Sequence, residues 1–289
     1  MHQVMSVTEL ITIVILLLLP ILYEHSHSFR YYLKFVIYYG LIMLTSVLVI
    51  PIMIWKPRNV ENLILASFLC RHISDILGLQ WELRGEDYLK KKEPCVIVAN
   101  HQSSIDILGM FELWPVMRRC TVVAKKELLY AGPFGIAAWL CGLVFIDRLN
   151  SEASRLAINN SIKHLHEKKI KMWVFPEGTR KNTGEIHAFK KGAFHAAITA
   201  QLPILPVVFT RFYFLHSKEC ILEQGRIVIT VLPPMETCGL SLDDLPQLMT
   251  TTHTTMSHVF ATTSKELLEQ LKEDRNSPLL PVQSYFVDH

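Results

Sequence analysis

The stretch from Val96 to Gly109, VIVANHQSSIDILG, decides the fold of this 289-residue chain. Four apolar, mostly β-branched residues run into Asn100 and His101, and an apolar pattern resumes at helical spacing after Asp106. This order predicts a strand, a loop and a helix. It places His101 at the carboxyl end of a strand and Asp106 near a helix start, at the edge where α/β proteins hold their functional groups.

His101 and Asp106 are residue types that can form a general base and the carboxylate that orients it. If Asp106 accepts a hydrogen bond from Nδ1 of His101, the other ring nitrogen can take a proton from a hydroxyl group. The five-residue spacing alone is unspecific, because a histidine that follows a strand more often has a structural role. The hypothesis therefore depends on the residues at the other strand ends.

Seven short segments predict the strands of one sheet, and one of them contains the strand of the opening stretch. They are Trp81–Arg84, Cys95–Ala99, Thr121–Ala124, Leu143–Ile146, Met172–Phe175, Ile204–Thr210 and Ile227–Val231. Helical stretches between them, such as Asn59–Leu77 and Ser151–Lys168, favour an α/β fold with a mainly parallel, mixed sheet flanked by helices. A long amphipathic helix is expected from Leu242 to Leu271, although the threonines within it weaken that prediction.

Two apolar segments precede this domain and predict a helical membrane segment. Residues 10–23 would make a helix of about 21 Å, shorter than a hydrocarbon core of about 30 Å. Residues 35–55 are uncharged, with aromatic residues near their ends and flanking lysines, which fits a spanning helix. Two arrangements of these segments remain possible from the sequence: two membrane-spanning helices, or a helical hairpin within one leaflet. We expect a membrane anchor over residues 1–58, the α/β domain over 59–275 and an irregular tail over 276–289.

The composition excludes several classes of protein. Hydrophobic residues make up 50% of the chain, and the net charge of +3 is too small to indicate nucleic-acid binding. The mean hydropathy of +0.27 is high for a purely soluble domain. The six cysteines include no C-x-x-C pair, so neither a disulfide framework nor a zinc knuckle is expected.

Further polar clusters follow other predicted strands. Glu177, Gly178, Thr179 and Arg180 lie in a loop within VFPEGTR (174–180), Lys125 follows a strand, Arg148 ends another, and Lys190 and Lys191 precede a helix. The carboxyl ends of parallel strands meet at one edge, so these side chains should share a rim with His101. The planar guanidinium of Arg180 suits a phosphate group. Each cluster alone is compatible with a surface turn, but together they predict an anion-binding site.

Four segments, in this order, resemble those of the glycerolipid acyltransferase family. They are NHQSSID (100–106), KKELLYAGPFG with VFIDR (125–148), VFPEGTR with FKKGAF (174–194) and LPILPVV (202–208). The likeness is to the 1-acyl-sn-glycerol-3-phosphate acyltransferases and covers about residues 60–235 together with the N-terminal membrane segments. It implies acyl transfer from acyl-CoA to the sn-2 hydroxyl of lysophosphatidic acid, which gives phosphatidic acid and CoA.

The same resemblance implies a role for each site residue. His101 takes the hydroxyl proton, Asp106 orients and stabilises the imidazolium, and the substrate oxygen attacks the thioester directly. Binding of the glycerol phosphate is implied for Arg180 with Glu177, Gly178 and Thr179, and Lys125 and Arg148 are the supporting cations. No metal and no bound cofactor are implied, and acyl-CoA is a co-substrate. The other implied partners are lysophosphatidic acid and the bilayer of the endoplasmic reticulum, with the site facing the cytosol.

Three alternatives remain at this point. The same chemistry could act on another acceptor, such as glycerol 3-phosphate or a lysophospholipid with a head group. A membrane-anchored, metal-dependent hydrolase could use His101 and Asp106 as ligands, but the sequence has no H-E-x-x-H motif. A non-enzymatic lipid-binding scaffold would keep the membrane segment but would not need both residues.

Overall fold

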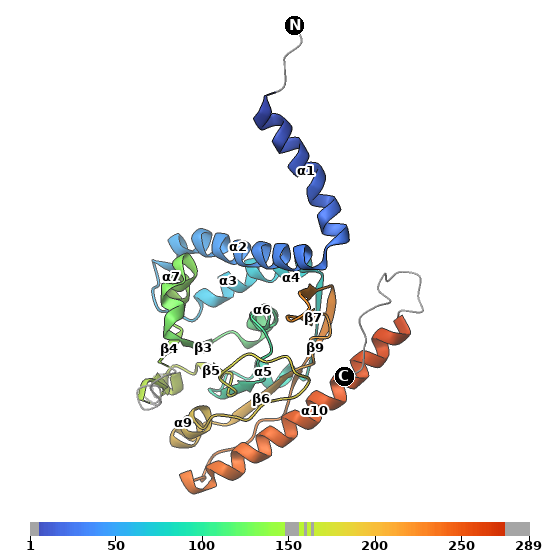
Figure 1. The fold of residues 1–289 in the computed structure, drawn as a ribbon. Coiled ribbons are helices and arrows are strands. Elements are labelled where there is room, and N and C mark those ends of the chain that lie inside the picture. Colours follow the sequence, from blue (N-terminus) through green and yellow to red (C-terminus); the bar gives the residue numbers. More distant parts are fainter. Residues whose placement is uncertain (1–5, 148–155, 159–160, 163–164, 275–289) are drawn as a thin grey trace.

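The computed structural model describes residues 6–147, 156–158, 161–162 and 165–274. A seven-stranded sheet forms the centre of this part, in the order β1-β9-β6-β2-β5-β3-β4 (Figure 1). Its strands are β1 (Leu79–Arg84), β2 (Val96–Ala99), β3 (Cys120–Lys125), β4 (Val144–Ile146), β5 (Lys171–Val174), β6 (Ile204–Phe209) and β9 (Gly225–Val231). All neighbours are parallel except β6 and β9. The expected mainly parallel, mixed sheet is confirmed, with strand ends shifted by one or two residues.

β2 lies in the middle of the sheet because all four of its residues are apolar and can be buried on both faces. It pairs in parallel with β5 on one side and β6 on the other. Alternate residues point to opposite faces: Ile97 and Ala99 join one hydrophobic core, whereas Val96 and Val98 join the other. The strand therefore delivers His101 to the edge between two buried layers.

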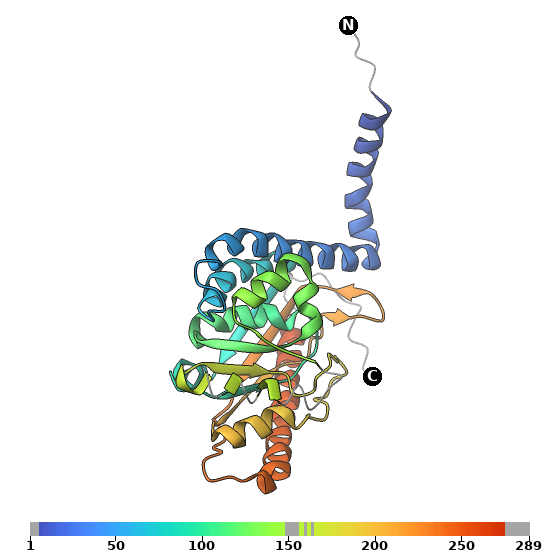
Figure 2. The same ribbon diagram turned by 90° about the vertical axis from the view of Figure 1, so that its left-hand side faces the viewer.

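Helices cover both faces of the sheet (Figures 1 and 2). On the first face are α2 (His27–Met53), α3 (Asn62–Cys70), α4 (His72–Leu77), α6 (Asp106–Met117) and α7 (Gly132–Leu140), and on the other are α9 (Gly192–Ala200) and α10 (Leu245–Asp274). The predicted helix Asn59–Leu77 is divided at Arg71 into α3 and α4. Only part of the predicted helix Ser151–Lys168 is described, and its residues 156–158, 161–162 and 165–167 are helical.

The predicted long C-terminal helix is present as α10, preceded by the 3-10 helix η2 (Leu242–Asp244). The threonines do not interrupt it, because their hydroxyls bond within the helix. The hydroxyls of Thr250, Thr252 and Thr263 each donate to the carbonyl oxygen four residues earlier.

The N-terminal apolar segments form two helices, α1 (Val7–His25) and α2, both long and apolar enough to cross a membrane. Ser26 caps α2 by accepting a hydrogen bond from the backbone N–H of Phe29, 3.2 Å away. α1 projects away from the body, whereas α2 lies across it (Figures 1 and 2). The two helices therefore diverge and do not form a closely packed hairpin.

α2 packs on the α/β domain through residues spaced three or four apart, which mark one face of a helix. Tyr38, Ile42, Val49 and Met53 are buried in the same core as α6 and the sheet. Ser46 is buried on this face as well. The boundary at residue 58 stays a prediction, but α2 contributes to the core of the α/β domain as well as being long and apolar enough to cross a membrane.

Several short elements have no pattern from which they could be predicted. They are α5 (Asp87–Lys90), the 3-10 helix η1 (Lys126–Tyr130) and the hairpin of β7 (Leu215–His216) and β8 (Ile221–Leu222). The hairpin is held to α2 by Lys34, whose ammonium group donates to the carbonyl oxygen of Leu222 at 2.7 Å. Strands of two residues are too short to show an alternation, so only tertiary contacts define them.

Candidate active site

His101 and Asp106 form a buried pair in the loop between β2 and α6. Nδ1 of His101 lies 2.5 Å from Oδ2 of Asp106, and the two residues are 8% and 1% exposed. The carboxylate of Asp106 also accepts backbone N–H groups of Gln102 at 2.9 Å and Ser103 at 3.2 Å. Asp106 is the first residue of α6, where the helix dipole favours a negative charge. The carboxylate is therefore fixed before any substrate arrives.

The other ring nitrogen of His101 is an acceptor. Nε of Arg180 lies 3.4 Å from Nε2 of His101, and a guanidinium can only donate. The proton of the neutral imidazole must then be on Nδ1, toward Asp106. The imidazole also stacks on Phe175, with ring centroids 4.0 Å apart and an interplanar angle of 16°. This tautomer and ring orientation are those of a general base.

Two amides hold the loop against the end of β6. Asn100 donates from Nδ2 to the carbonyl oxygen of Phe209 at 3.0 Å and accepts the backbone N–H of Phe209 at 2.8 Å. Gln102 donates to the carbonyl oxygen of Thr210 at 2.9 Å and accepts the N–H of Phe212 at 3.2 Å. The end of β6 and the residues after it thus position the loop that carries His101 and Asp106.

α2 holds the same loop from the other side. The hydroxyl of Tyr38 donates to the carbonyl oxygen of Ser104 at 2.8 Å, and the hydroxyl of Tyr39 donates to Oγ of Ser104 at 2.9 Å. Neither tyrosine was predicted to have a functional role. The aromatic residues at the end of an apolar segment indicate a membrane interface as readily as a contact with a loop.

Glu177 is buried beside the pair and bonds to the backbone. Oε1 accepts the N–H of His101 at 2.7 Å, and Oε2 accepts the N–H of His187 at 3.1 Å. Burial raises the pKa of the Glu177 carboxyl to about 7, and the two N–H groups act in the opposite direction. Its part in binding substrate stays a prediction, but both carboxylate oxygens already have backbone partners.

The remaining loop residues reach the rim of the site. Gly178 has φ +73°, and the space that a Cβ would need is filled by Lys190, whose Cε would lie 2.8 Å away. Thr179 and Arg180 are exposed and line the same cavity as His101. Lys125, at the end of β3, lines it too. Arg148 lies outside the described residues, so its placement is not assigned.

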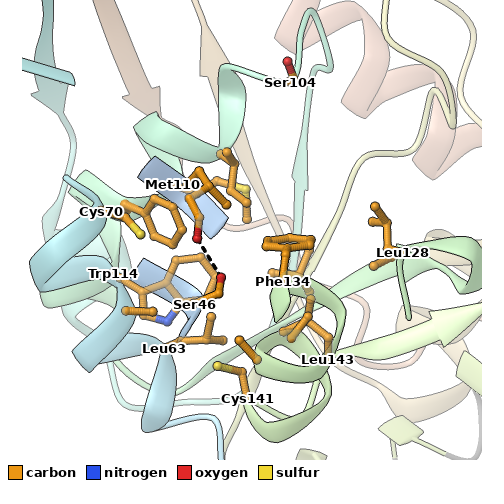
Figure 3. A pocket seen from close by; sticks show the side chains of 18 of the residues that line it. Ser46, Leu63, Cys70, Ser104, Met110, Trp114, Leu128, Phe134, Cys141 and Leu143 are labelled. Carbon is orange, nitrogen blue, oxygen red and sulfur yellow. Dashed lines mark hydrogen bonds between the residues drawn. The ribbon is translucent and has the colours of Figure 1, made fainter. Parts of the chain in front are cut away.

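A cavity of about 380 Å³ leads inward from this rim. Its walls come from α2, α3, α6, α7 and β3 and are mainly apolar (Figure 3). The lining includes Ser46, Leu63, Trp114 and Phe134, none of which was predicted as a site residue. The signal in the sequence is the pair of small polar residues Thr45 and Ser46 within an apolar helix. Within the described residues no cluster of three His, Cys, Asp or Glu side chains could hold a metal ion.

The chain is similar in sequence to known acyltransferases. Residues 80–210 match the family model described as Acyltransferase. The chain is 41% identical over 244 residues to 1-acyl-sn-glycerol-3-phosphate acyltransferase alpha of Homo sapiens, covering 84% of this chain and 86% of that protein. It is 36% identical over 253 residues to the beta protein of the same species, covering 86% and 90%.

A solved structure has the same fold. The crystal structure of the 1-acyl-sn-glycerophosphate (LPA) acyltransferase PlsC from Thermotoga maritima superposes with a TM-score of 0.62 at 21% identity. The match covers 84% of this chain and 98% of that chain. The arrangement of sheet and helices is therefore shared over most of both molecules.

Proposed function

Because this chain belongs to the 1-acyl-sn-glycerol-3-phosphate acyltransferase family, we propose that it transfers an acyl group from acyl-CoA to the sn-2 hydroxyl of lysophosphatidic acid. The products are phosphatidic acid, a precursor of phospholipids and triacylglycerols, and CoA. The observation that supports this most directly is Nε2 of His101, an acceptor nitrogen at the mouth of an apolar cavity and beside a cation.

The chemistry follows from the two ring nitrogens. Nε2 of His101 takes the proton of the sn-2 hydroxyl while its oxygen attacks the carbonyl carbon of the thioester. Asp106 stabilises the imidazolium across the 2.5 Å hydrogen bond. The tetrahedral intermediate then breaks its C–S bond, and the leaving thiolate takes the proton back from Nε2. No enzyme nucleophile is needed, and we propose that the reaction requires no bound cofactor or metal because the thioester is already activated.

The phosphate of the acceptor belongs beside the base. In lysophosphatidic acid only two carbon atoms separate the sn-2 oxygen from the phosphate ester oxygen. A phosphate bound by Arg180, whose Nε is 3.4 Å from Nε2 of His101, would therefore hold the hydroxyl within reach of the base. Lys125 and Thr179 line the same rim and can add donors. Arg148 stays a further candidate from its place in the sequence.

The acyl chain of the donor fits the apolar cavity, which starts at His101 and runs between α2, α3, α6 and α7. α2 forms one wall of this cavity, and its opposite face is apolar and exposed, as Val36, Leu44 and Leu48 show. We propose that α1 and this face of α2 lie in the endoplasmic reticulum membrane, with the site on the cytosolic side. Both amphiphilic substrates could then reach the base from one leaflet.

The test is an acyl-CoA assay on the full-length protein in membranes, in which released CoA is detected through its thiol. Lysophosphatidic acid should be the best acceptor, ahead of glycerol 3-phosphate and of lysophospholipids with a head group. Faster transfer to another acceptor would change the assigned substrate. CoA release that needs no acceptor would overturn the function, since it would indicate a thioesterase.

His101→Ala should lower transfer on the order of 10²- to 10⁴-fold, because a positioned base contributes that much. His258→Ala, an exposed histidine on α10, is the matched control and should retain activity. Normal activity of His101→Ala would show that His101 is not the base and would contradict the proposed mechanism. A chelator should leave the wild-type rate unchanged if no metal takes part.

A further inference from the structure

The proposed chemistry gives no role to the two lysines of the FKKGAF segment (189–194). Lys190 and Lys191 are both exposed and lie just before α9. The backbone N–H of Lys190 donates to the carbonyl oxygen of Pro176 at 2.8 Å, which ties this segment to the VFPEGTR loop. The fold therefore brings one of the two lysines to the loop that carries the phosphate-binding arginine of the proposed function.

The side chain of Lys190 lies over Gly178. The atoms nearest to the position of a Cβ on Gly178 are Cε, Nζ and Cδ of Lys190, at 2.8, 2.9 and 3.1 Å. Its ammonium group is therefore next to the residue that precedes Thr179 and Arg180, both of which line the cavity. Consecutive Cα atoms are about 3.8 Å apart, so the Cα atoms of Gly178 and Arg180 lie within roughly 8 Å of each other. The missing Cβ at position 178 leaves the room that this lysine occupies.

Lys190 has no carboxylate partner in the described part of the chain. The lysines that form ion pairs there are Lys90, Lys126 and Lys265. The charge of Lys190 is held at the loop without a counter-charge, so it is available to an anion that binds there. Lys191 is also exposed, but none of its atoms is among those nearest to the Cβ position of Gly178. The structure thus distinguishes between the two neighbouring lysines.

Lys190 reaches the loop from outside the cavity. Arg180 and Lys125 line the cavity together with His101, whereas Lys190 does not. Under the proposed function the glycerol of the acceptor lies toward His101, so Lys190 faces the phosphate oxygen that points away from the cavity. In lysophosphatidic acid this oxygen is free and charged, but in a lysophospholipid with a head group it carries the head group. A phosphate monoester has about 1.5 to 2 negative charges at pH 7, which a diester cannot have because one of its ionisable oxygens is esterified.

We propose that Lys190 is a specificity-determining residue that, together with Arg180, favours an acceptor with a phosphate monoester over one with a phosphodiester. An ammonium group donates up to three hydrogen bonds and gains most from an oxygen that carries a negative charge. Esterification of the outward oxygen removes that charge and places the head group against Lys190. This inference rests on the proposed function, because it concerns the acceptor that Arg180 and His101 hold.

The test measures kcat/KM of the full-length protein in membranes for three acceptors: lysophosphatidic acid, lysophosphatidylglycerol, which is a phosphodiester, and monoacylglycerol, which has no phosphate. Lys190→Met keeps an unbranched side chain over Gly178 but removes the charge. It should lower the ratio of lysophosphatidic acid to lysophosphatidylglycerol by about five- to twenty-fold, mainly through a higher KM for lysophosphatidic acid. This is a modest value for a charge-assisted hydrogen bond because the group is exposed. Transfer to monoacylglycerol should be unchanged, and Lys190→Arg should keep most of the ratio.

Lys191→Met is the matched control, since it removes the same charge one residue away, and it should leave the ratio unchanged. The inference is overturned if Lys190→Met has the wild-type ratio or if Lys191→Met shifts the ratio equally. It is also overturned if all three acceptors lose activity together, which would indicate a packing role. A higher KM for acyl-CoA with an unchanged KM for lysophosphatidic acid would overturn it as well, because Lys190 would then bind a phosphate of CoA. Wild-type protein that acylates none of the acceptors would instead overturn the proposed function.

Discussion

Nε of Arg180 lies 3.4 Å from Nε2 of His101, so the cation of the VFPEGTR loop lies directly beside the nitrogen proposed as the base. The two residues are 79 positions apart in the chain. They meet because β2 and β5 are parallel neighbours whose carboxyl ends lie at one edge of the sheet. Under the proposed function, the contact places the phosphate-binding cation next to the base that takes the proton.

Arg180→Ala is therefore expected to raise the KM for lysophosphatidic acid about ten- to one-hundred-fold, the value of a charge-assisted hydrogen bond, with a smaller effect on kcat. Arg180→Lys should restore part of the affinity, since it keeps the charge but loses the planar fork. Lys181→Ala, an exposed cation next in sequence, is the control. Steady-state kinetics in lysophosphatidic acid decide the matter: an unchanged KM with a reduced kcat would mean that Arg180 does not bind the phosphate.

The hydrogen bond between Tyr39 of α2 and Ser104 predicts that α2 positions the loop that carries His101 and Asp106. Tyr39→Phe and Ser104→Ala remove the same 2.9 Å hydrogen bond, so each should lower kcat about two- to ten-fold. The double variant should lose no more than either single variant, because residues that share one bond are not additive. Tyr32→Phe, whose hydroxyl is near Cys220 and not near the loop, should behave as wild type. Additive losses would show that the hydrogen bond does not position the loop.

Glu177 predicts a pH dependence of stability. Its pKa is raised from 4.5 to about 7 in the folded protein, so between these values the native state binds more protons than the unfolded state. The contribution to the free energy of unfolding is thus full below about pH 4.5 and is lost as the pH rises through 7. Between pH 5 and pH 8 the loss should be about 2 to 3 kcal/mol. Denaturant unfolding at these two pH values should show this difference shrinking in Glu177→Gln; an equal difference in both proteins would refute it.

Truncation experiments should distinguish the roles of α1 and α2, because only α2 is expected to be needed for folding. Among the residues of α1 whose burial is described, none in the apolar window is buried, so removal of residues 1–25 should leave the fold and the cavity intact while weakening retention in the membrane. Removal of residues 1–53 takes away the buried face of α2, including Tyr38 and Met53, and should prevent folding. Far-UV circular dichroism and membrane sedimentation of both truncated proteins measure these outcomes. A folded protein lacking residues 1–53 would contradict the role given to α2.

Much of the fold was predictable from local patterns. Apolar runs bounded by polar loops identified the inner strands β2, β5 and β6, because a strand buried on both faces must be apolar along most of its length. The same patterns placed His101, Lys125 and Arg180 at strand ends, and parallel pairing brought them to one rim. The site could be located for this reason, although nothing tested Arg148, which lies outside the described residues.

The sequence by itself determined which residues are buried, which lie at strand ends and where a base and a phosphate-binding cation occur. Only the tertiary structure decided their partners: Glu177 on the N–H of His101, Tyr39 on Ser104, and Trp114 in a cavity walled by α2. The physical reason is that the hydrophobic periodicity of a sequence indicates whether a side chain is buried, but not which other residues it contacts. Contacts across 65 or 76 residues depend on sheet order and helix packing, which no local pattern specifies.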